Sequence, residues 1–189
     1  FIQLGRRRLN FAKSFHPGPD LVMLHGVTRR WQTFLPLWSS LAPRWQLFAL
    51  DFRGHGASDH VNNAYRVCDY AEDVIAFLDA QFDRPIVLYG HSLGAMVAAD
   101  VAARVPERIS AIVLEDPPLH TMGQRIAQTP LLSFFQSMQR LAGDGRSVSL
   151  VARELSESLI FDPVRGTRSR LGDMRDAASL RFTAAYLKR

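Results

Sequence analysis

The chain of 189 residues is long enough to bury a core of its own, as one domain or as one domain with a small appendage. Hydrophobic residues make up 47% and charged residues 22%, which is ordinary for a soluble globular protein. No apolar run approaches a membrane span, the N-terminal residues do not follow a signal-peptide pattern, and the single cysteine cannot form an internal disulfide. We therefore expect a cytoplasmic protein.

The net charge of +5 comes almost entirely from arginine, since Lys13 and Lys188 are the only lysines. Binding of nucleic acid or of a membrane surface needs basic residues gathered on one face with aromatic side chains between them. Here they are spread along the chain, apart from Arg6-Arg7-Arg8 and the stretch from Arg165 to Arg170. This distribution is typical of solvated surface arginine, and we expect neither nucleic acid nor membrane as a partner.

The first half of the chain alternates between short apolar runs and helical patterns. Residues 1–15 predict a hairpin or two short edge strands, with a turn near Gly5. Strand-length apolar runs follow at Leu21–Leu24, Trp45–Leu50, Pro85–Tyr89 and Ile109–Leu114. Between them, Trp31–Leu41 and Asp69–Phe82 carry apolar residues at helical spacing, and Asp69 can cap the second helix. This alternation predicts a mostly parallel sheet with right-handed connections.

The turn Gly90-His91-Ser92-Leu93-Gly94 follows the third of these strands and precedes an alanine-rich helix, Ala95–Arg104. The Gly-x-Ser-x-Gly pattern alone is loose. A strand before it and a helix after it are, however, the setting of a nucleophile elbow, in which a strained serine projects from the top of a sheet. The helix N-terminus supplies free N–H groups that suit a developing oxyanion.

Polar residues gather where the predicted strands end. His25, Asp51, Ser92 and Asp116 all lie at or just past carboxyl ends. Ligands bind beyond these ends in open parallel sheets, so the sequence predicts a site there.

After Pro118 the pattern changes to helical stripes, and no strand is evident. The stripes span Leu131–Leu141, Val148–Leu159 and Ala177–Leu187, with breakers at Gly143–Gly145 and Asp162-Pro163. The sequence therefore predicts two parts, an α/β core over residues 1–118 and a helical region over residues 119–189.

Four motifs in register resemble the α/β-hydrolase fold: Leu24-His25-Gly26, Asp51–Ser58, Gly90–Gly94 and Leu114–Pro117. The resemblance covers Leu21 to Pro118 strongly, and the helices that follow correspond to the family's cap. It implies an α/β protein with a mostly parallel sheet of the α/β-hydrolase type and a helical cap. It says much less about the substrate, because one fold hosts many chemistries.

Within this resemblance, Ser92 corresponds to the catalytic nucleophile, and the backbone N–H groups of Val27 and Leu93 to the oxyanion hole. His25 would organise its loop rather than act as the base, and His91 would shape the turn. Serine at the elbow separates the chain from haloalkane dehalogenases and epoxide hydrolases, which use aspartate there, and implies acyl transfer. The resemblance calls for no metal and no cofactor.

The family's chain order is nucleophile, acid, histidine. Only His120 follows Ser92, and it would need an unusual geometry to act as the base. Asp116 or Glu115 could be the acid, in a variant that places it after this strand. The alternative, which we favour at this point, is that Asp116-Pro117 only ends the strand and starts the connection to the cap.

The sequence stops before the last two strands of the family, which usually carry the acid and the histidine. We expect a segment of a longer hydrolase, completed by missing residues or by a second chain. Without those strands, Ile109–Leu114 would be an exposed apolar edge.

The leading expectation is a serine hydrolase that acts on small carboxylic esters through an acyl-enzyme at Ser92. Residues of the cap could line its pocket: Leu131, Phe134, Phe135 and Met138. Carbon–carbon bond hydrolysis, lactone opening and perhydrolysis stay open as alternatives, because they differ in pocket shape and in the histidine region. A second alternative is a non-catalytic ligand-binding or interaction protein on a hydrolase scaffold.

Overall fold

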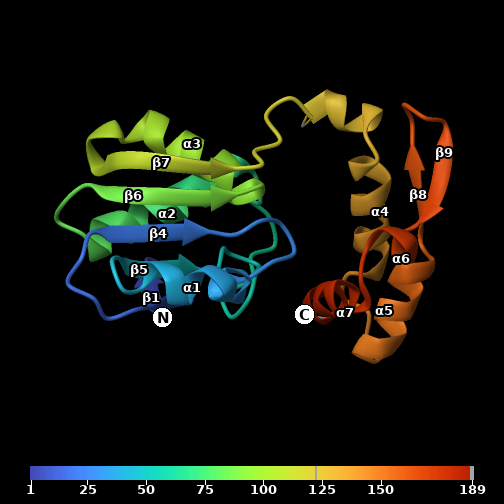
Figure 1. Cartoon of the computed structure of the whole chain (residues 1–189), viewed down its shortest axis with the longest axis horizontal. Coiled ribbons are helices and arrows are strands. Elements are labelled where there is room, and N and C mark those ends of the chain that lie inside the picture. The colour runs from blue at the N-terminus through green and yellow to red at the C-terminus, as the bar shows by residue number, and fades with distance from the viewer. Residues whose placement is uncertain (122, 188–189) are drawn as a thin grey trace. The chain divides into compact units, whose positions relative to one another are not determined.

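A computed structural model describes residues 1–121 and 123–187 (Figure 1). The chain divides into two compact units, Phe1–Pro118 (unit 1) and Leu119–Arg189 (unit 2). Among the described residues, no helix is both long enough and apolar enough to cross a membrane.

Unit 1 is built on a five-stranded sheet of order β3-β5-β4-β6-β7 (Figure 1). Its strands are β3 (Phe11–Lys13), β4 (Asp20–Leu24), β5 (Gln46–Leu50), β6 (Ile86–His91) and β7 (Ile109–Glu115). The edge strand β3 runs antiparallel to β5, and the other pairings are parallel. This confirms the mostly parallel α/β sheet that the sequence predicts.

Helices cover both faces of the sheet. On one face, α2 (Val67–Gln81) and α3 (Leu93–Arg104) pack in a core that includes Phe77, Leu88 and Val101. On the other, the 3-10 helix η1 (Trp31–Phe34) and α1 (Leu35–Leu41) pack on the alternate side chains of the same strands. Figure 1 shows α1 in front of the sheet and α2 behind it.

The remaining elements of unit 1 are short. β1 (Ile2–Leu4) and β2 (Arg7–Leu9) form the predicted antiparallel hairpin, with Gly5 at a φ of +58° in its turn. A 3-10 helix, η2 (Pro106–Arg108), leads from α3 into β7.

The helix α2 begins at Val67, two residues before the predicted start. Arg66 is its N-cap residue, and Asp69 stands at the third helical position. The Asp69 carboxylate accepts the Arg66 backbone N–H at 2.8 Å, as in a capping box. Asp69 therefore caps the helix as predicted, but from inside its first turn.

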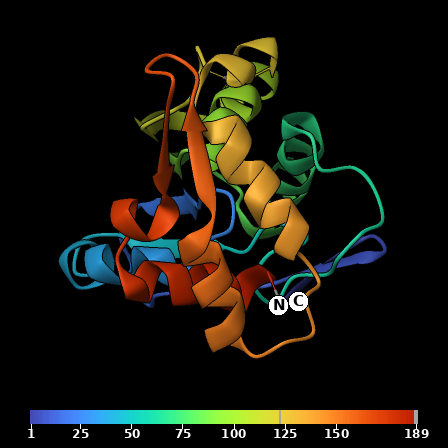
Figure 2. The same ribbon diagram turned by 90° about the vertical axis from the view of Figure 1, so that its right-hand side faces the viewer.

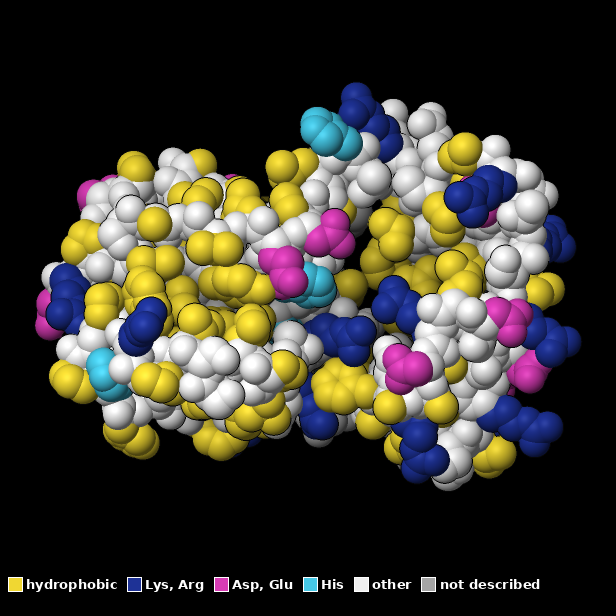
Figure 3. All heavy atoms as spheres, viewed as in Figure 1, with side chains coloured by type: hydrophobic (Ala, Val, Ile, Leu, Met, Phe, Trp, Pro, Cys, Tyr) yellow, Lys and Arg dark blue, Asp and Glu magenta, His cyan; other side chains and the backbone are white. Residues whose placement is uncertain are grey.

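The strand β7 pairs with β6 alone among the described residues, so its outer edge is open. Ile112 and Val113 on it are 40% and 47% exposed. Figure 3, viewed as in Figure 1, shows hydrophobic side chains on the face of unit 1 where β6 and β7 lie toward the viewer. This is the exposed apolar edge expected from the sequence.

Unit 2 contains a β-hairpin, which corrects the prediction of no strand beyond Leu119. Its helices are η3 (Gly123–Gln128), α4 (Leu131–Leu141), α5 (Val148–Glu157), α6 (Leu171–Met174) and α7 (Ala177–Leu187). The hairpin pairs β8 (Leu159–Asp162) with β9 (Thr167–Arg170), which lie side by side in Figures 1 and 2.

The turn chemistry at Asp162 explains the error. Its side chain accepts hydrogen bonds from the backbone N–H groups of Val164 and Arg165, at 2.9 and 3.1 Å. Such an Asx-type turn reverses the chain, whereas the Asp-Pro pair by itself predicts only a break. Leu159, which the periodicity assigns to the second helical stripe, therefore starts β8 instead.

The helices of unit 2 pack around their own core. Met138 is 4% exposed and packs with Leu155, Ile160 and Leu180 from the neighbouring elements. Of the side chains predicted to line a pocket, Met138 is thus a core residue, while Phe134 and Phe135 are partly buried against this core.

A buried ion pair ties the loop after β5 to α2. Arg53, 1% exposed, donates through Nε to Asp73 at 2.5 Å and through its other nitrogens to the backbone carbonyls of Ala64 and Asp69. Asp73, also 1% exposed, contacts the guanidinium of Arg7 at 2.9 Å. The buried charges of Arg53 and Asp73 are therefore paired, and the contacts fix the loop that precedes α2.

We expect Asp73→Asn to lower the free energy of unfolding by about 3–5 kcal/mol, because it leaves the buried Arg53 guanidinium without its counter-charge. Asp79→Asn is the matched control. It breaks the pair with Arg108, in which Asp79 is 60% exposed, and should cost less than about 1 kcal/mol. Urea unfolding of both variants measures the difference, and equal losses would contradict the role of the buried pair.

Candidate active site

Ser92 lies between the end of β6 and the start of α3, with φ of +52° and ψ of −112°. Residues other than glycine rarely adopt a positive φ, so the backbone at Ser92 is strained. Strand, strained serine and helix form the geometry expected of a nucleophile elbow. The serine also stands at the N-terminus of a 12-residue helix, where the helix dipole favours negative charge.

The two glycines of the motif allow main chains to approach closely. A Cβ on Gly90 would lie 2.2 Å from the carbonyl oxygen of Gly94, and one on Gly94 would lie 2.0 Å from that of Leu24. Real Cβ atoms do not make such contacts. The first turn of α3 therefore rests directly on β6 and on the end of β4.

The loop after β4 lies against Ser92. A Cβ on Gly26 would come within 3.3 Å of Cβ of Ser92 and 2.9 Å of Nδ1 of His91. The loop closes through a hydrogen bond from Arg29 N–H to the Gly26 carbonyl, at 3.2 Å. Val27 within this turn and Leu93 after Ser92 donate no backbone hydrogen bond to any described residue. These two N–H groups, predicted as oxyanion donors, are thus free to bind a ligand oxygen.

Backbone strain is concentrated at this end of the sheet. Four non-glycine residues of the described chain have a positive φ, and three of them follow strand ends: Thr28 after β4, Ser92 after β6 and Asp116 after β7. Strain of this kind costs about 1–3 kcal/mol per residue and persists only where the surroundings hold it.

The two candidate acids differ in their surroundings. The Glu115 side chain accepts a hydrogen bond from the Tyr89 hydroxyl. Asp116, with φ of +46°, makes no side-chain hydrogen bond or ion pair within the described residues. Sequence reasoning missed Tyr89. Its position two residues before His91, hence on the same sheet face, was the available signal.

His25 is a structural residue in this loop. It is fully buried, its Nδ1 donates to the Gly26 carbonyl at 2.8 Å, and its Nε2 accepts the Phe52 N–H at 3.2 Å. Burial holds the pKa of His25 well below its usual value, and the nearby His55 lowers it further. The pKa of His55 is also lowered by burial. His25 thus fastens the loop after β4 to the loop after β5.

Asp51 is likewise occupied. It is 1% exposed, and its carboxylate accepts hydrogen bonds from Trp31 N–H at 2.6 Å, Ala57 N–H at 3.0 Å and the Asn10 side chain at 2.8 Å. Both carboxylate oxygens of Asp51 are therefore engaged, and they connect its own loop with Asn10 and with the start of η1. His120 lies in unit 2, at an exposed turn.

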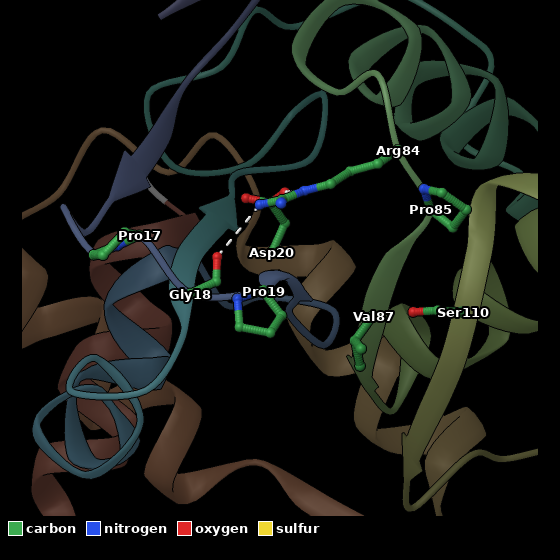
Figure 4. Close-up of a pocket in the computed structure, with 8 residues that line it drawn as sticks. All are labelled: Pro17, Gly18, Pro19, Asp20, Arg84, Pro85, Val87 and Ser110. Carbon is green, nitrogen blue, oxygen red and sulfur yellow. Dashed lines mark hydrogen bonds and ion pairs between the residues drawn. The ribbon is translucent and has the colours of Figure 1, made fainter.

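No group of three or more histidine, cysteine or acidic side chains in the described residues could hold a metal ion. A cavity of about 290 Å³ is lined by residues that lie just before or at the start of β4, β6 and β7, and Arg84 reaches across it to Asp20 (Figure 4). It therefore lies at the amino ends of the strands, opposite Ser92, and is not a candidate for the substrate site.

Comparisons with known proteins identify the family of the chain. Residues 19–153 match the model of the alpha/beta hydrolase fold family. The chain is 34% identical over 115 residues to the 2-(acetamidomethylene)succinate hydrolase of Mesorhizobium japonicum, covering 61% of this chain and 41% of that protein. It is 35% identical over 115 residues to the lipase LipV of Mycobacterium tuberculosis, covering 59% and 42%.

A solved structure extends the likeness across both units. The crystal structure of E-2-(acetamidomethylene)succinate hydrolase matches 98% of this chain and 71% of that one, with a TM-score of 0.64 and 26% identity. The chain belongs to the α/β-hydrolase family. The matches span less than half the length of the two curated relatives.

The two buried histidines predict an acid-sensitive fold. In the unfolded chain a histidine binds a proton near pH 6.5, whereas burial keeps His25 and His55 neutral in the folded state. Their contribution is complete above about pH 6.5 and is lost as the pH falls, by up to about 1.4 kcal/mol per pH unit for each histidine.

Urea unfolding between pH 7 and 5 measures this slope. His55→Asn, whose amide can still donate to the Arg53 carbonyl that Nδ1 contacts, should reduce the slope, and His120→Gln at an exposed position should not. An identical pH dependence for His55→Asn and the unchanged protein would contradict the assignment.

Proposed function

We propose that the complete protein is a serine hydrolase of small carboxylic esters, with Ser92 as the nucleophile. The observation that carries the proposal is the strained Ser92, flanked by two unbonded backbone N–H groups, of Val27 and Leu93. Donors of this kind, held rigidly around a reacting carbonyl, are what acyl transfer requires.

In the proposed reaction, Oγ of Ser92 attacks the ester carbonyl carbon and its proton passes to a histidine base. The carbonyl oxygen becomes an oxyanion, which accepts hydrogen bonds from the backbone N–H groups of Val27 and Leu93. Collapse of this intermediate expels the alcohol, which takes the proton from the histidine, and leaves an acyl-enzyme. Water then attacks the acyl group, releases the acid and restores Ser92.

The base is proposed to lie outside unit 1. Both ring nitrogens of His25 are engaged with backbone groups, so it cannot accept the proton of Ser92. The chain order of the family, in which the histidine comes last, supports the same view.

We propose Asp116 as the carboxylate that orients this histidine, in preference to Glu115. Support comes from its positive φ, from a side chain with no partner among the described residues, and from its place next to Glu115, whose carbonyl accepts the Ser92 N–H at 2.9 Å. Glu115 is already engaged by Tyr89. The strained backbone thus favours Asp116, against the sequence-based preference for a plain strand end.

Two of the relatives are named for ester chemistry, a lipase and a pimeloyl-[acyl-carrier protein] methyl ester esterase of Chromobacterium violaceum, and a third for succinate derivatives. These names support hydrolysis at a carbonyl in general. No feature of unit 1 favours carbon–carbon hydrolysis, lactone opening or perhydrolysis over it.

In the complete protein, Ser92→Ala should abolish labelling by a fluorophosphonate probe and lower kcat/KM for p-nitrophenyl butyrate by about 10³-fold or more. Ser110→Ala, at an exposed position on β7, is the control and should label normally. Absence of labelling in the folded, complete, unchanged protein would favour the non-catalytic binding alternative.

Asp116→Asn should lower kcat by about 10²–10⁴-fold, because the amide cannot hold the imidazolium that forms in the transition state. Glu107→Gln, at an exposed position in η2, controls for the loss of one surface charge. Steady-state kinetics of both variants decide the matter, and near-normal turnover in Asp116→Asn would remove Asp116 as the acid.

A further inference from the structure

The side chain of Tyr89 touches more than one part of the candidate site. It stands on β6, two residues before His91, and packs with the cluster on the α1 face of the sheet. Its ring meets that of Phe34 edge-on, with centroids 5.7 Å apart. Phe34 is 1% exposed and belongs to η1, the element that follows the turn with Val27.

At its other end, the Tyr89 hydroxyl donates to the Glu115 carboxylate. Glu115 is the last residue of β7, and in the sheet register it stands opposite His91. Its backbone carbonyl accepts the N–H of Ser92 at 2.9 Å. Glu115 is therefore held twice, through its side chain by Tyr89 and through its main chain by the nucleophile.

These contacts surround the strained residues. Ser92 and Asp116 both have a positive φ. The backbone N–H of Ser92 donates to the carbonyl of Glu115, and Asp116 is the next residue along the chain. A left-handed residue relaxes unless its neighbours are fixed on both sides. The hydrogen bond between Tyr89 and Glu115 fixes the end of β7 relative to β6. The contact of the Tyr89 ring with Phe34 fixes β6 against η1.

We infer that Tyr89 and Glu115 form a positioning pair, which holds the Ser92 turn and the Asp116 turn in the register that catalysis needs. The inference rests on the proposed function of Ser92. Burial of the phenol and its bond to the Glu115 carboxylate raise the pKa of Tyr89 above its usual value. The Tyr89 hydroxyl therefore stays protonated and remains the hydrogen-bond donor throughout the neutral pH range.

The direct alternative is that Glu115 itself is the acid that orients the histidine. Its carboxylate would then have to exchange Tyr89 for the imidazole in the active protein. A variant that keeps the hydrogen-bond acceptor of Glu115 and removes its charge separates the two roles. Its kcat should be nearly normal if Glu115 is a positioning residue, and strongly lowered if Glu115 is the acid.

Tyr89→Phe removes the hydroxyl and keeps the ring against Phe34. We expect kcat of the complete protein to fall about tenfold with KM within about twofold, as for a residue that positions the catalytic groups rather than binding substrate. Tyr65→Phe is the matched control, since the Tyr65 hydroxyl donates to the Val61 carbonyl in an exposed loop, and it should leave kcat unchanged.

Variants of the partner separate positioning from direct catalysis. Glu115→Gln keeps an acceptor oxygen and should retain kcat within about threefold, whereas Glu115→Ala should match Tyr89→Phe. The double variant Tyr89→Phe, Glu115→Ala should be no slower than either single variant, as expected for partners in one interaction. A loss in Glu115→Gln as large as that in Asp116→Asn would overturn the inference and make Glu115 the acid.

A second measurement needs no activity and can use the 189-residue chain. The Ser92 amide donates to Glu115, so Tyr89→Phe should raise its hydrogen-exchange rate about tenfold, while the amide of Met23 in the central strand β4 stays unchanged. Faster exchange with unaltered kcat would make the contact structural only and contradict the inference, as would unaltered exchange. Because exchange is independent of turnover, failure of the pair is distinguishable from failure of the proposed function, which the Ser92→Ala variant tests.

Discussion

The structure depends on one close approach between main chains. Helix α3 starts so near the end of β4 that a side chain on Gly94 would strike the carbonyl of Leu24 at 2.0 Å. Gly90 allows a similar approach between β6 and the first turn of α3, since a Cβ on Gly90 would lie 2.2 Å from the carbonyl oxygen of Gly94. Because no side chain separates these backbones, the helix N-terminus, the serine before it and the loop after β4 are held at the same edge of the sheet.

Hydrogen bonds from buried side chains also hold the loops at this edge of the sheet in place. His25 and Asp51 use their side chains to join loops, through backbone N–H and carbonyl groups that would otherwise be buried without partners. Beside Ser92, the backbone N–H groups of Val27 and Leu93 donate to no other described residue. Rigid support around a small set of free donors is the arrangement in which hydrogen bonds stabilise a transition state at low reorganisation cost.

The sequence predicts the mostly parallel sheet, the helices between its strands and the elbow, because strand and helix periodicities in unit 1 are short, clear and separated by glycine or proline. It fails where local turn chemistry decides. Asp162 builds a hairpin turn with its side chain, and periodicity cannot distinguish that from a helix end. The spacing of Tyr89 from His91 places both on one sheet face, but it does not identify Glu115 as the partner, because that depends on the register of β6 and β7. The strain at Asp116 has no signature in residue types.

The proposed mechanism places the carbonyl oxygen of an acyl group bonded to Oγ of Ser92 between the backbone N–H groups of Val27 and Leu93. A crystal structure of the complete protein after reaction with a phosphonate ester tests it most directly. We expect phosphorus bonded to Oγ of Ser92, and a phosphonyl oxygen about 2.7–3.1 Å from the backbone nitrogens of both Val27 and Leu93. A phosphonate on any other residue, or an oxygen turned away from both nitrogens, would contradict it.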